Sequence, residues 1–253
     1  ATRPRRACGS RRSPPRCVAA ESRFTQEPRD GGDGDRDPEP ASEADVSTWI
    51  ARVNADIDIT WAALDGAIPQ LDDATASSAR ALLGHAEALK ARVALAARQP
   101  IAALKIRHHG DYHLGQVLMS EHDFIIVDFE GEPSRPVAER RVKHSPLRDV
   151  AGMIRSFDYA AAVALREATA MRDEDRVYLQ LYAYAWCRAA SAAFTEAYFA
   201  TVGDSGVVPP QGGQALLDLF TIEKALYEIR YELSSRPAWL AVPVQGLVRL
   251  LNG

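Results

Sequence analysis

The 253-residue chain carries 30 Lys and Arg against 34 Asp and Glu, has a formal net charge of -4, and is 47% hydrophobic. This composition is typical of a globular chain that forms one large domain or two small ones. The mild acidity gives no electrostatic reason to expect nucleic acid or an anionic membrane as a partner. The sequence contains no run of about 18 apolar residues, so no transmembrane helix is predicted.

The first segment, residues 1–42, differs in composition from the rest of the chain. It is rich in Arg, Pro, Gly and Asp and shows no apolar periodicity. Because such a segment buries too little apolar surface to offset its ordering entropy, we expect a disordered arm, with a partner-binding basic arm as the alternative. Two of the three cysteines, Cys8 and Cys17, lie in it and the third is Cys187. Because the number of cysteines is odd and two of them lie in the predicted arm, we expect no disulfide framework and a reducing, cytoplasmic location.

From residue 43 the pattern becomes helical. Apolar residues recur at three- and four-residue spacing, which predicts one amphipathic helix: Val46, Ile50, Val53, Ile57 and Trp61. The stretch TASSARALLGHAEALKARVALAARQP, residues 75–100, predicts a second helix with a Thr/Ser start and Pro100 as its stop.

The period then changes to that of strands. The short runs GQVLM and FIIVDF are separated by SEHD, which predicts a β-hairpin. Helical patterns return after this hairpin, and helices are expected at 146–167, 173–201, 213–234 and 243–251. The predicted fold class is therefore mostly α, with one small β element.

Oxygen-bearing side chains cluster at one end of the predicted hairpin. Asp111 precedes the first strand, Gln116 follows five residues later, and Asp128 ends the second strand. Magnesium prefers hard oxygen ligands and leaves positions for phosphate, and phosphoryl transfer needs a carboxylate that orients the attacking hydroxyl. The pattern fits Asp111 as the base, with Gln116 and Asp128 as metal ligands. A plain hairpin with solvated acids is the competing interpretation.

The same stretch carries a resemblance to known families. HGD, a Gln five residues after its Asp, and DFE match the protein-kinase pattern of HRD, Asn and DFG. The HGD form resembles the aminoglycoside-phosphotransferase branch of the kinase-like superfamily. Within it, HGDYHLGQVL, IVDFEGEPSRPVAERRVKHSPLRDVAGMIRSFDYAA and KALYEIRYELSSRPAWLAVPVQGL resemble maltokinases, including those fused to trehalose synthase.

The resemblance covers residues 43–253. It implies the helical C-terminal lobe of a kinase-like fold, with the catalytic loop at 108–130 and acceptor-binding helices at 146–251. The implied enzyme is a phosphotransferase that moves the γ-phosphate of ATP to the anomeric hydroxyl of maltose, giving maltose 1-phosphate for glycogen and α-glucan synthesis. ATP and Mg²⁺ are the implied cofactors, maltose and trehalose synthase the implied partners. Asp111 matches the catalytic base, and Gln116 and Asp128 match the magnesium ligands.

Further residues are assigned to the loop. His109 and Asp149 are expected to support it, although Asp149 also fits an ordinary acid in the first turn of a helix that begins at Ser145 and Pro146. His113 is placed on the substrate side, where it braces the loop rather than reacts. A zinc site is not favoured, because no Cys or second His pair follows at ligand spacing.

Three side chains are assigned to the acceptor pocket. Lys224, Tyr227 and Tyr231 share one face of the predicted helix at 213–234. Aromatic rings beside an amine suit a sugar, and the resemblance implies an acceptor pocket in this lobe. From the residues alone, an amphipathic helix with half-buried tyrosines is the alternative.

The nucleotide half of such a site is not found. A kinase-like enzyme clamps ATP with a strand-borne lysine of its N-terminal lobe. Of the four lysines, Lys90, Lys105, Lys143 and Lys224, none lies on a predicted strand ahead of the helices at 43–98, so an N-terminal lobe is expected to be missing. Three interpretations stay open: a truncated maltokinase, an inactive pseudokinase-like lobe associated with trehalose synthase, and a related kinase for another sugar such as glucosamine.

Overall fold

The computed structural model describes residues 37–98, 102–121, 123–132, 136–168, 172–203 and 205–252. Most of the predicted arm, up to residue 36, therefore lies outside the described residues. The last residues of the predicted arm belong to the fold, because strand β1 (Glu39–Pro40) pairs antiparallel with β2 (Leu104–Lys105). The folded part thus begins a few residues ahead of the predicted boundary at 43.

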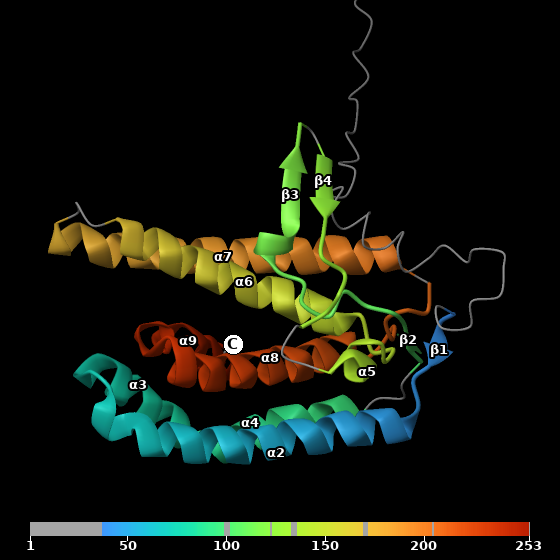
Figure 1. Ribbon diagram of the computed structural model, residues 1–253, viewed down its shortest axis with the longest axis horizontal. Coiled ribbons are helices and arrows are strands. Elements are labelled where there is room, and N and C mark those ends of the chain that lie inside the picture. The colour runs from blue at the N-terminus through green and yellow to red at the C-terminus, as the bar shows by residue number, and fades with distance from the viewer. Residues whose placement is uncertain are drawn as a thin grey trace, which may run out of the picture.

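The helices form three layers (Figure 1). One outer layer holds α6 (Leu147–Glu167) and α7 (Asp173–Val202), the middle layer holds α8 (Gly213–Ser235) and α9 (Ala241–Asn252), and the other outer layer holds α2 (Glu43–Ala67), α3 (Asp73–Leu83) and α4 (Ala86–Ala94). Because α8 is covered from both sides, its buried residues occur all round the helix. The core of the protein is centred on α8.

Helix α2 starts at a reciprocal cap. The hydroxyl of Ser42 accepts the backbone N–H of Asp45 at 3.1 Å, and the Asp45 carboxylate accepts the backbone N–H of Ser42 at 2.8 Å. This pairing satisfies two N–H groups that a helix start otherwise leaves without a partner. Val46, Val53 and Ile57 of the predicted apolar face are fully buried, so the prediction of an amphipathic helix is confirmed.

The helix predicted at 75–100 is in fact two helices. α3 begins earlier than expected, because the Asp72 carboxylate accepts the backbone N–H groups of Ala74 and Thr75. It ends at Leu83 with Gly84 as its C-cap, and α4 follows after a short turn. The sequence pattern missed this break because the apolar spacing continues across it. Pro100, the predicted stop, lies outside the described residues.

The predicted hairpin is present and consists of β3 (Val117–Ser120) and β4 (Asp123–Ile126), paired antiparallel with Val117 opposite Ile126. It projects away from the helical layers (Figure 1). The remaining elements are short helices: η1 (Ile68–Gln70), η2 (Leu95–Ala97), η3 (Leu114–Gln116), α5 (Val137–Arg140) and η4 (Pro237–Trp239).

The later helices lie where the sequence predicts them. α6, α7, α8 and α9 agree with the expected spans to within two residues at each end. α6 is assigned from Leu147, and the Ser145 hydroxyl accepts the backbone N–H of Leu147 at 3.4 Å. The prediction of a mostly helical lobe is confirmed, although the described residues form two small antiparallel sheets, β1–β2 and β3–β4, where one β element was expected. In the described part of the chain, no helix combines the length and the apolar character that crossing a bilayer requires.

Candidate active site

The first turn of α6 holds the loop that precedes the hairpin. The buried carboxylate of Asp149 accepts the backbone N–H of His109 at 2.6 Å and that of Gly110 at 2.9 Å. Gly110 has a positive φ of 84°, and a Cβ there would lie 3.1 Å from the Cα of Gly131, so only glycine suits this turn. Both carboxylate oxygens of Asp149 are therefore used to fix the backbone just before Asp111.

The imidazole of His109 joins this loop to the end of the hairpin. Its Nδ1 accepts the backbone N–H of Asp111 at 3.3 Å, so its Nε2 carries the proton and donates to the carbonyl of Val127 at 2.8 Å. The ring is buried and lies 4.8 Å, centroid to centroid, from that of Phe129. Both ring nitrogens are therefore engaged with the backbone, as the predicted supporting role of His109 requires.

Asp111 lies where the loop meets α8. One carboxylate oxygen is 3.4 Å from Nζ of Lys224, and the other is 3.9 Å from Nε2 of His113. Lys224 also lies 3.7 Å from a carboxylate oxygen of Glu132. His113 caps η3, because its Nδ1 accepts the backbone N–H of Gly115 at 3.0 Å. The predicted base thus sits between two basic side chains, and the predicted brace, His113, contacts both the base and the loop backbone.

The two predicted metal ligands lie together at the base of the hairpin. The side-chain amide of Gln116 donates to the carboxylate of Asp128 at 2.9 Å. Asp128 has a positive φ of 65°, a conformation that Asp tolerates better than most residues. A carboxylate and an amide oxygen fit the ligand preference of Mg²⁺, which keeps its other positions for water and phosphate. Among the described residues, no three His, Cys, Asp or Glu side chains are grouped so that they could hold a metal.

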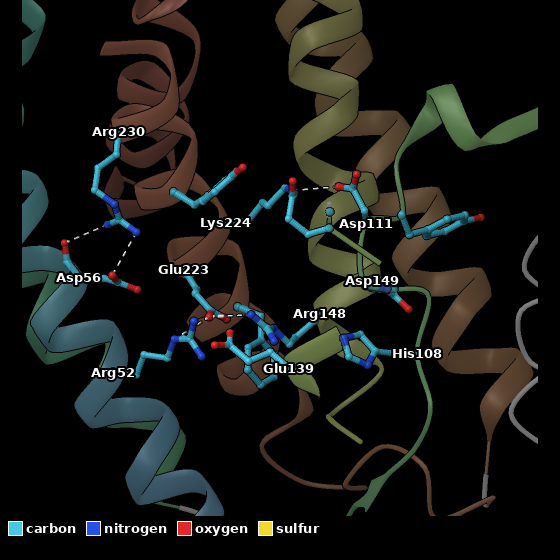
Figure 2. Close-up of a pocket in the computed structure, with 16 residues that line it drawn as sticks. Arg52, Asp56, His108, Asp111, Glu139, Arg148, Asp149, Glu223, Lys224 and Arg230 are labelled. Carbon is cyan, nitrogen blue, oxygen red and sulfur yellow. Dashed lines mark hydrogen bonds and ion pairs between the residues drawn. The ribbon is translucent and has the colours of Figure 1, made fainter. Parts of the chain in front are cut away.

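A cleft of about 210 Å³ opens between α2, the loop, α6 and α8 (Figure 2). The described residues that line it include four basic and six acidic side chains, a surplus of two carboxylates: Arg52, Arg148, Lys224 and Arg230 against Asp56, Asp111, Glu132, Glu139, Asp149 and Glu223. His108, Gly110, Tyr112, Gly152, Phe220 and Tyr227 complete the lining. Gln116 and Asp128 are not part of it.

Ion pairs across the cleft connect α8 to its neighbours, and the sequence did not reveal them. Figure 2 shows Arg230 of α8 directed at Asp56 of α2, where a guanidinium nitrogen lies 3.0 Å from the carboxylate. Arg148 and Arg52 converge on the carboxylate of Glu223, at 2.7 Å and 3.6 Å. Glu223, Tyr227 and Arg230 are spaced at i, i+4 and i+7, which indicates that they share one face of α8. This spacing could have identified the face of α8 that lines the cleft.

The structure separates the three residues assigned to the acceptor pocket. Lys224 and Tyr227 line the cleft, with Nζ of Lys224 5.1 Å from the centroid of the Tyr227 ring. Tyr231 does not line it and is 44% exposed. Its ring stacks on that of Tyr227 at 6.2 Å and lies under the guanidinium of Arg236. Tyr231 therefore lies beyond Tyr227, one further turn along α8.

Behind the cleft, buried charges hold α6 against α8. Arg155 of α6 contacts Glu228 of α8 at 2.8 Å and also pairs with Asp158, while the hydroxyl of Tyr159 donates to Glu232 at 2.9 Å. Burial raises the pKa of Glu228, and the Arg155 guanidinium opposes that shift. Removing one partner of such a pair leaves a charge without compensation in the core, so the two helices are held in one arrangement.

The chain resembles known proteins in both its sequence and its fold. No family model matches the chain. The chain is 28% identical over 212 residues to a glucosamine kinase of Streptacidiphilus jiangxiensis, and 35% identical over 152 residues to one of Mycolicibacterium smegmatis (strain ATCC 700084 / mc(2)155). These alignments cover 84% and 57% of the chain, but 44% and 34% of the relatives. The chain therefore spans less than half the length of the curated relatives it matches.

The solved structures that resemble the chain are also glucosamine kinases. A glucosamine kinase in crystal form B superposes with a TM-score of 0.68 at 25% identity, over 86% of the chain and 48% of that protein. A glucosamine kinase in complex with glucosamine, ADP and inorganic phosphate superposes with a TM-score of 0.67 at 24% identity, over 85% of the chain and 50% of that protein. The kinase-like fold is thus confirmed. The more specific resemblance to maltokinase is not supported by these relatives.

Proposed function

We propose that the chain is the catalytic and acceptor-binding lobe of an ATP-dependent kinase for an amino sugar of the glucosamine class. The observation that carries this proposal is Asp111, held on a rigid loop at the wall of a cleft whose lining has a surplus of carboxylates. The glucosamine kinases to which the chain is similar give independent support.

In the proposed reaction, a hydroxyl oxygen of the sugar attacks the γ-phosphorus of ATP as the bond from that phosphorus to the leaving oxygen of ADP breaks. The hydroxyl proton passes to the carboxylate of Asp111. Lys224, 3.4 Å from one oxygen of that carboxylate, orients it and leaves the other oxygen for the proton. Mg²⁺, held by Asp128 and Gln116, would neutralise charge on the phosphates when bound.

Two features of the cleft favour an amino sugar over maltose. Because acidic side chains outnumber basic ones in the lining, the cleft attracts a sugar that carries an ammonium group more than a neutral one. Its volume of about 210 Å³ lies below the range of about 300–1,000 Å³ that is typical of pockets for drug-sized ligands, which favours one sugar ring over two. Neither maltose nor a trehalose synthase partner gains support from the similar proteins.

The nucleotide part of the proposal concerns the complete kinase. Lys105, a strand-borne lysine among the described residues, pairs with Asp45 at 2.9 Å and does not line the cleft. The described residues therefore supply the proposed base, the metal ligands and the acceptor cleft. Because the relatives are more than twice as long as the matched region, ATP binding by the whole protein stays a proposal.

The test separates acceptor binding from phosphoryl transfer. Glucosamine, glucose and maltose are titrated into the chain by calorimetry. ADP formation with each sugar, Mg²⁺ and ATP is followed after the chain has been joined to the nucleotide-binding half of a glucosamine kinase. Glucosamine is expected to bind at least about tenfold more tightly than glucose, the neutral sugar of the same shape. Equal affinities, or tighter binding of maltose, would overturn the assignment of the acceptor.

The catalytic role is tested with a matched pair of variants. Asp111→Asn is expected to lower turnover by roughly 10²–10⁴-fold while glucosamine affinity changes little, since the base acts on the hydroxyl in the transition state. Asp175→Asn, at a partly exposed position on α7 outside the cleft lining, serves as the control. Sugar binding without ADP formation in the kinase completed with a nucleotide-binding half would favour the inactive, pseudokinase-like lobe instead.

A further inference from the structure

Helix α7 is apolar on two opposite sides. One side packs on α6 and buries Cys187, Phe194 and Tyr198. The opposite side is exposed and carries bulky apolar side chains on its first half: Tyr178 65%, Leu181 60% and Tyr182 74% exposed. Val177, 61% exposed, and Trp186, 49% exposed, flank it on its two edges, where Trp186 still contacts Phe157 of α6. From residue 177 to residue 195 the only charged residue is Arg188. A helix that is apolar all round is normally covered on all sides, so we expect a binding partner to cover this exposed face.

The second half of the same face is made of small residues. Ala185, Ala189, Ala192 and Ala193 are exposed and continue the stripe that Tyr178, Leu181 and Tyr182 begin, at three- and four-residue spacing. Bulky side chains of one helix pack best against small ones of another. The two halves of this face are thus complementary to each other, and an antiparallel pairing of two copies brings each half against the other.

We propose that the exposed face of α7 is a dimer interface, in which α7 of one copy lies antiparallel to α7 of a second copy of this chain. With Ala185 opposite Ala189 of the second copy, Leu181 faces Ala193 and Tyr182 faces Ala192. In the same register Tyr178 lies opposite Glu196, an exposed carboxylate that accepts the phenol hydroxyl. A two-fold axis repeats every one of these contacts, as an isologous interface requires.

The exposed area of this face is close to that of a small specific interface. An aromatic side chain offers about 150–250 Å², so the rings of Tyr178 and Tyr182 together with Leu181 leave about 300 Å² of apolar surface on each copy. Two copies would bury about 600 Å² from these side chains, and the four exposed alanines and the edge residues Val177 and Trp186 bring the total toward the lower bound of about 1,000 Å² for a specific interface. An anionic membrane is a poorer occupant, because such surfaces are bound by clusters of basic residues and this stretch has a single arginine.

The oligomeric state is the first readout. Light scattering and sedimentation over a concentration series should give twice the 27.6 kDa of the chain. Leu181→Glu and Tyr182→Glu should each weaken the dimer at least about tenfold, because they place a carboxylate in the paired apolar stripe. Since both positions are exposed in one copy, circular dichroism and thermal unfolding at a concentration where the chain is monomeric should not change. Met119→Glu, at an 80% exposed position on the hairpin, is the matched control.

The register is tested by cross-linking in a background in which Cys8 and Cys17 are replaced by serine. Leu181→Cys and Ala193→Cys stand about 18 Å apart on one helix, so they cannot be joined within a chain. A mixture of the two single variants should form disulfide-linked dimers under mild oxidation, while each variant alone should not. A monomer at every concentration, a dimer unaffected by Leu181→Glu, or cross-linking of Leu181→Cys alone would overturn the proposal, and so would binding of anionic vesicles by the monomer through this face.

Discussion

Replacing Asp149 by Asn tests whether one carboxylate holds the loop that carries Asp111. In the native chain its two oxygens accept the backbone N–H groups of His109 and Gly110, at 2.6 Å and 2.9 Å. Asparagine has the same shape but offers one oxygen and one NH₂ group. The NH₂ group must face a backbone N–H, and two donors cannot bond to each other. One hydrogen bond is therefore lost, and the other loses the assistance of the negative charge.

The structure allows the size of this effect to be estimated. A hydrogen bond to a charged group contributes about 1.5–3 kcal/mol, and leaving a buried donor unpaired costs about 1–3 kcal/mol. Asp149→Asn should therefore lower the free energy of unfolding by about 3 kcal/mol. For a chain of this size that corresponds to a melting temperature lowered by about 6–12 °C.

Urea and thermal unfolding followed by circular dichroism measure this change. The matched control is Asp72→Asn, because Asp72 caps α3 at the surface and asparagine is an equally good N-cap, so stability should change by less than about 0.5 kcal/mol. If Asp149→Asn unfolded within about 0.5 kcal/mol of the native chain, the two backbone hydrogen bonds would not be holding the loop, and the reasoning would be wrong.

The remaining predictions concern packing, charge and pH. Gly152→Ala would place a Cβ 2.5 Å from the backbone carbonyl of Tyr112, so it should cost about 1–3 kcal/mol in urea unfolding and weaken sugar binding in calorimetry. Glu228→Ala removes a partner of buried Arg155 and should destabilise the fold by about 3 kcal/mol, whereas an exposed pair would cost less than about 1 kcal/mol. Burial raises the pKa of the Cys187 thiol from its ordinary value of 9.0 to about 11. Between these two pH values the folded chain keeps a proton on Cys187 that the unfolded chain loses. The contribution of this thiol to the free energy of unfolding is therefore complete below pH 9 and is lost as the pH rises through 11. Iodoacetamide should label Cys187 at pH 8 more slowly in the folded chain than in urea.

The features that the sequence predicted well are encoded locally. The apolar faces of α2 and α6 follow from spacing along one helix, and the hairpin follows from two β-branched runs around a short polar turn. Gln116 and Asp128 were expected at one end of the hairpin from their distances to the strand ends, and the roles assigned to them and to Asp111 stay predictions. Gln116 and Asp128 accordingly contact each other in the structure.

The features that the sequence missed depend on residues far apart in the chain. Arg52 and Asp56 of α2 line the cleft because α2 packs on α8, and nothing in their own segment indicates this. Glu223 and Arg230 were overlooked, and Tyr231 was included, because the face of α8 that meets the cleft is set by the layers on both sides of it. The break at Gly84 was missed because apolar spacing alone does not register a cap.

The packing of α2 on α8 sets a constraint on synthesis. Thr60 of α2 accepts a hydrogen bond from Arg230 of α8, which lies 170 residues later in the chain. At about 5–20 residues per second, a ribosome needs roughly 10–30 s to add those residues. Throughout that interval the apolar face of α2, with Val53, Ile57 and Leu64, is without the helix that covers it. The nascent chain is therefore a candidate for chaperone binding until α8 has left the exit tunnel.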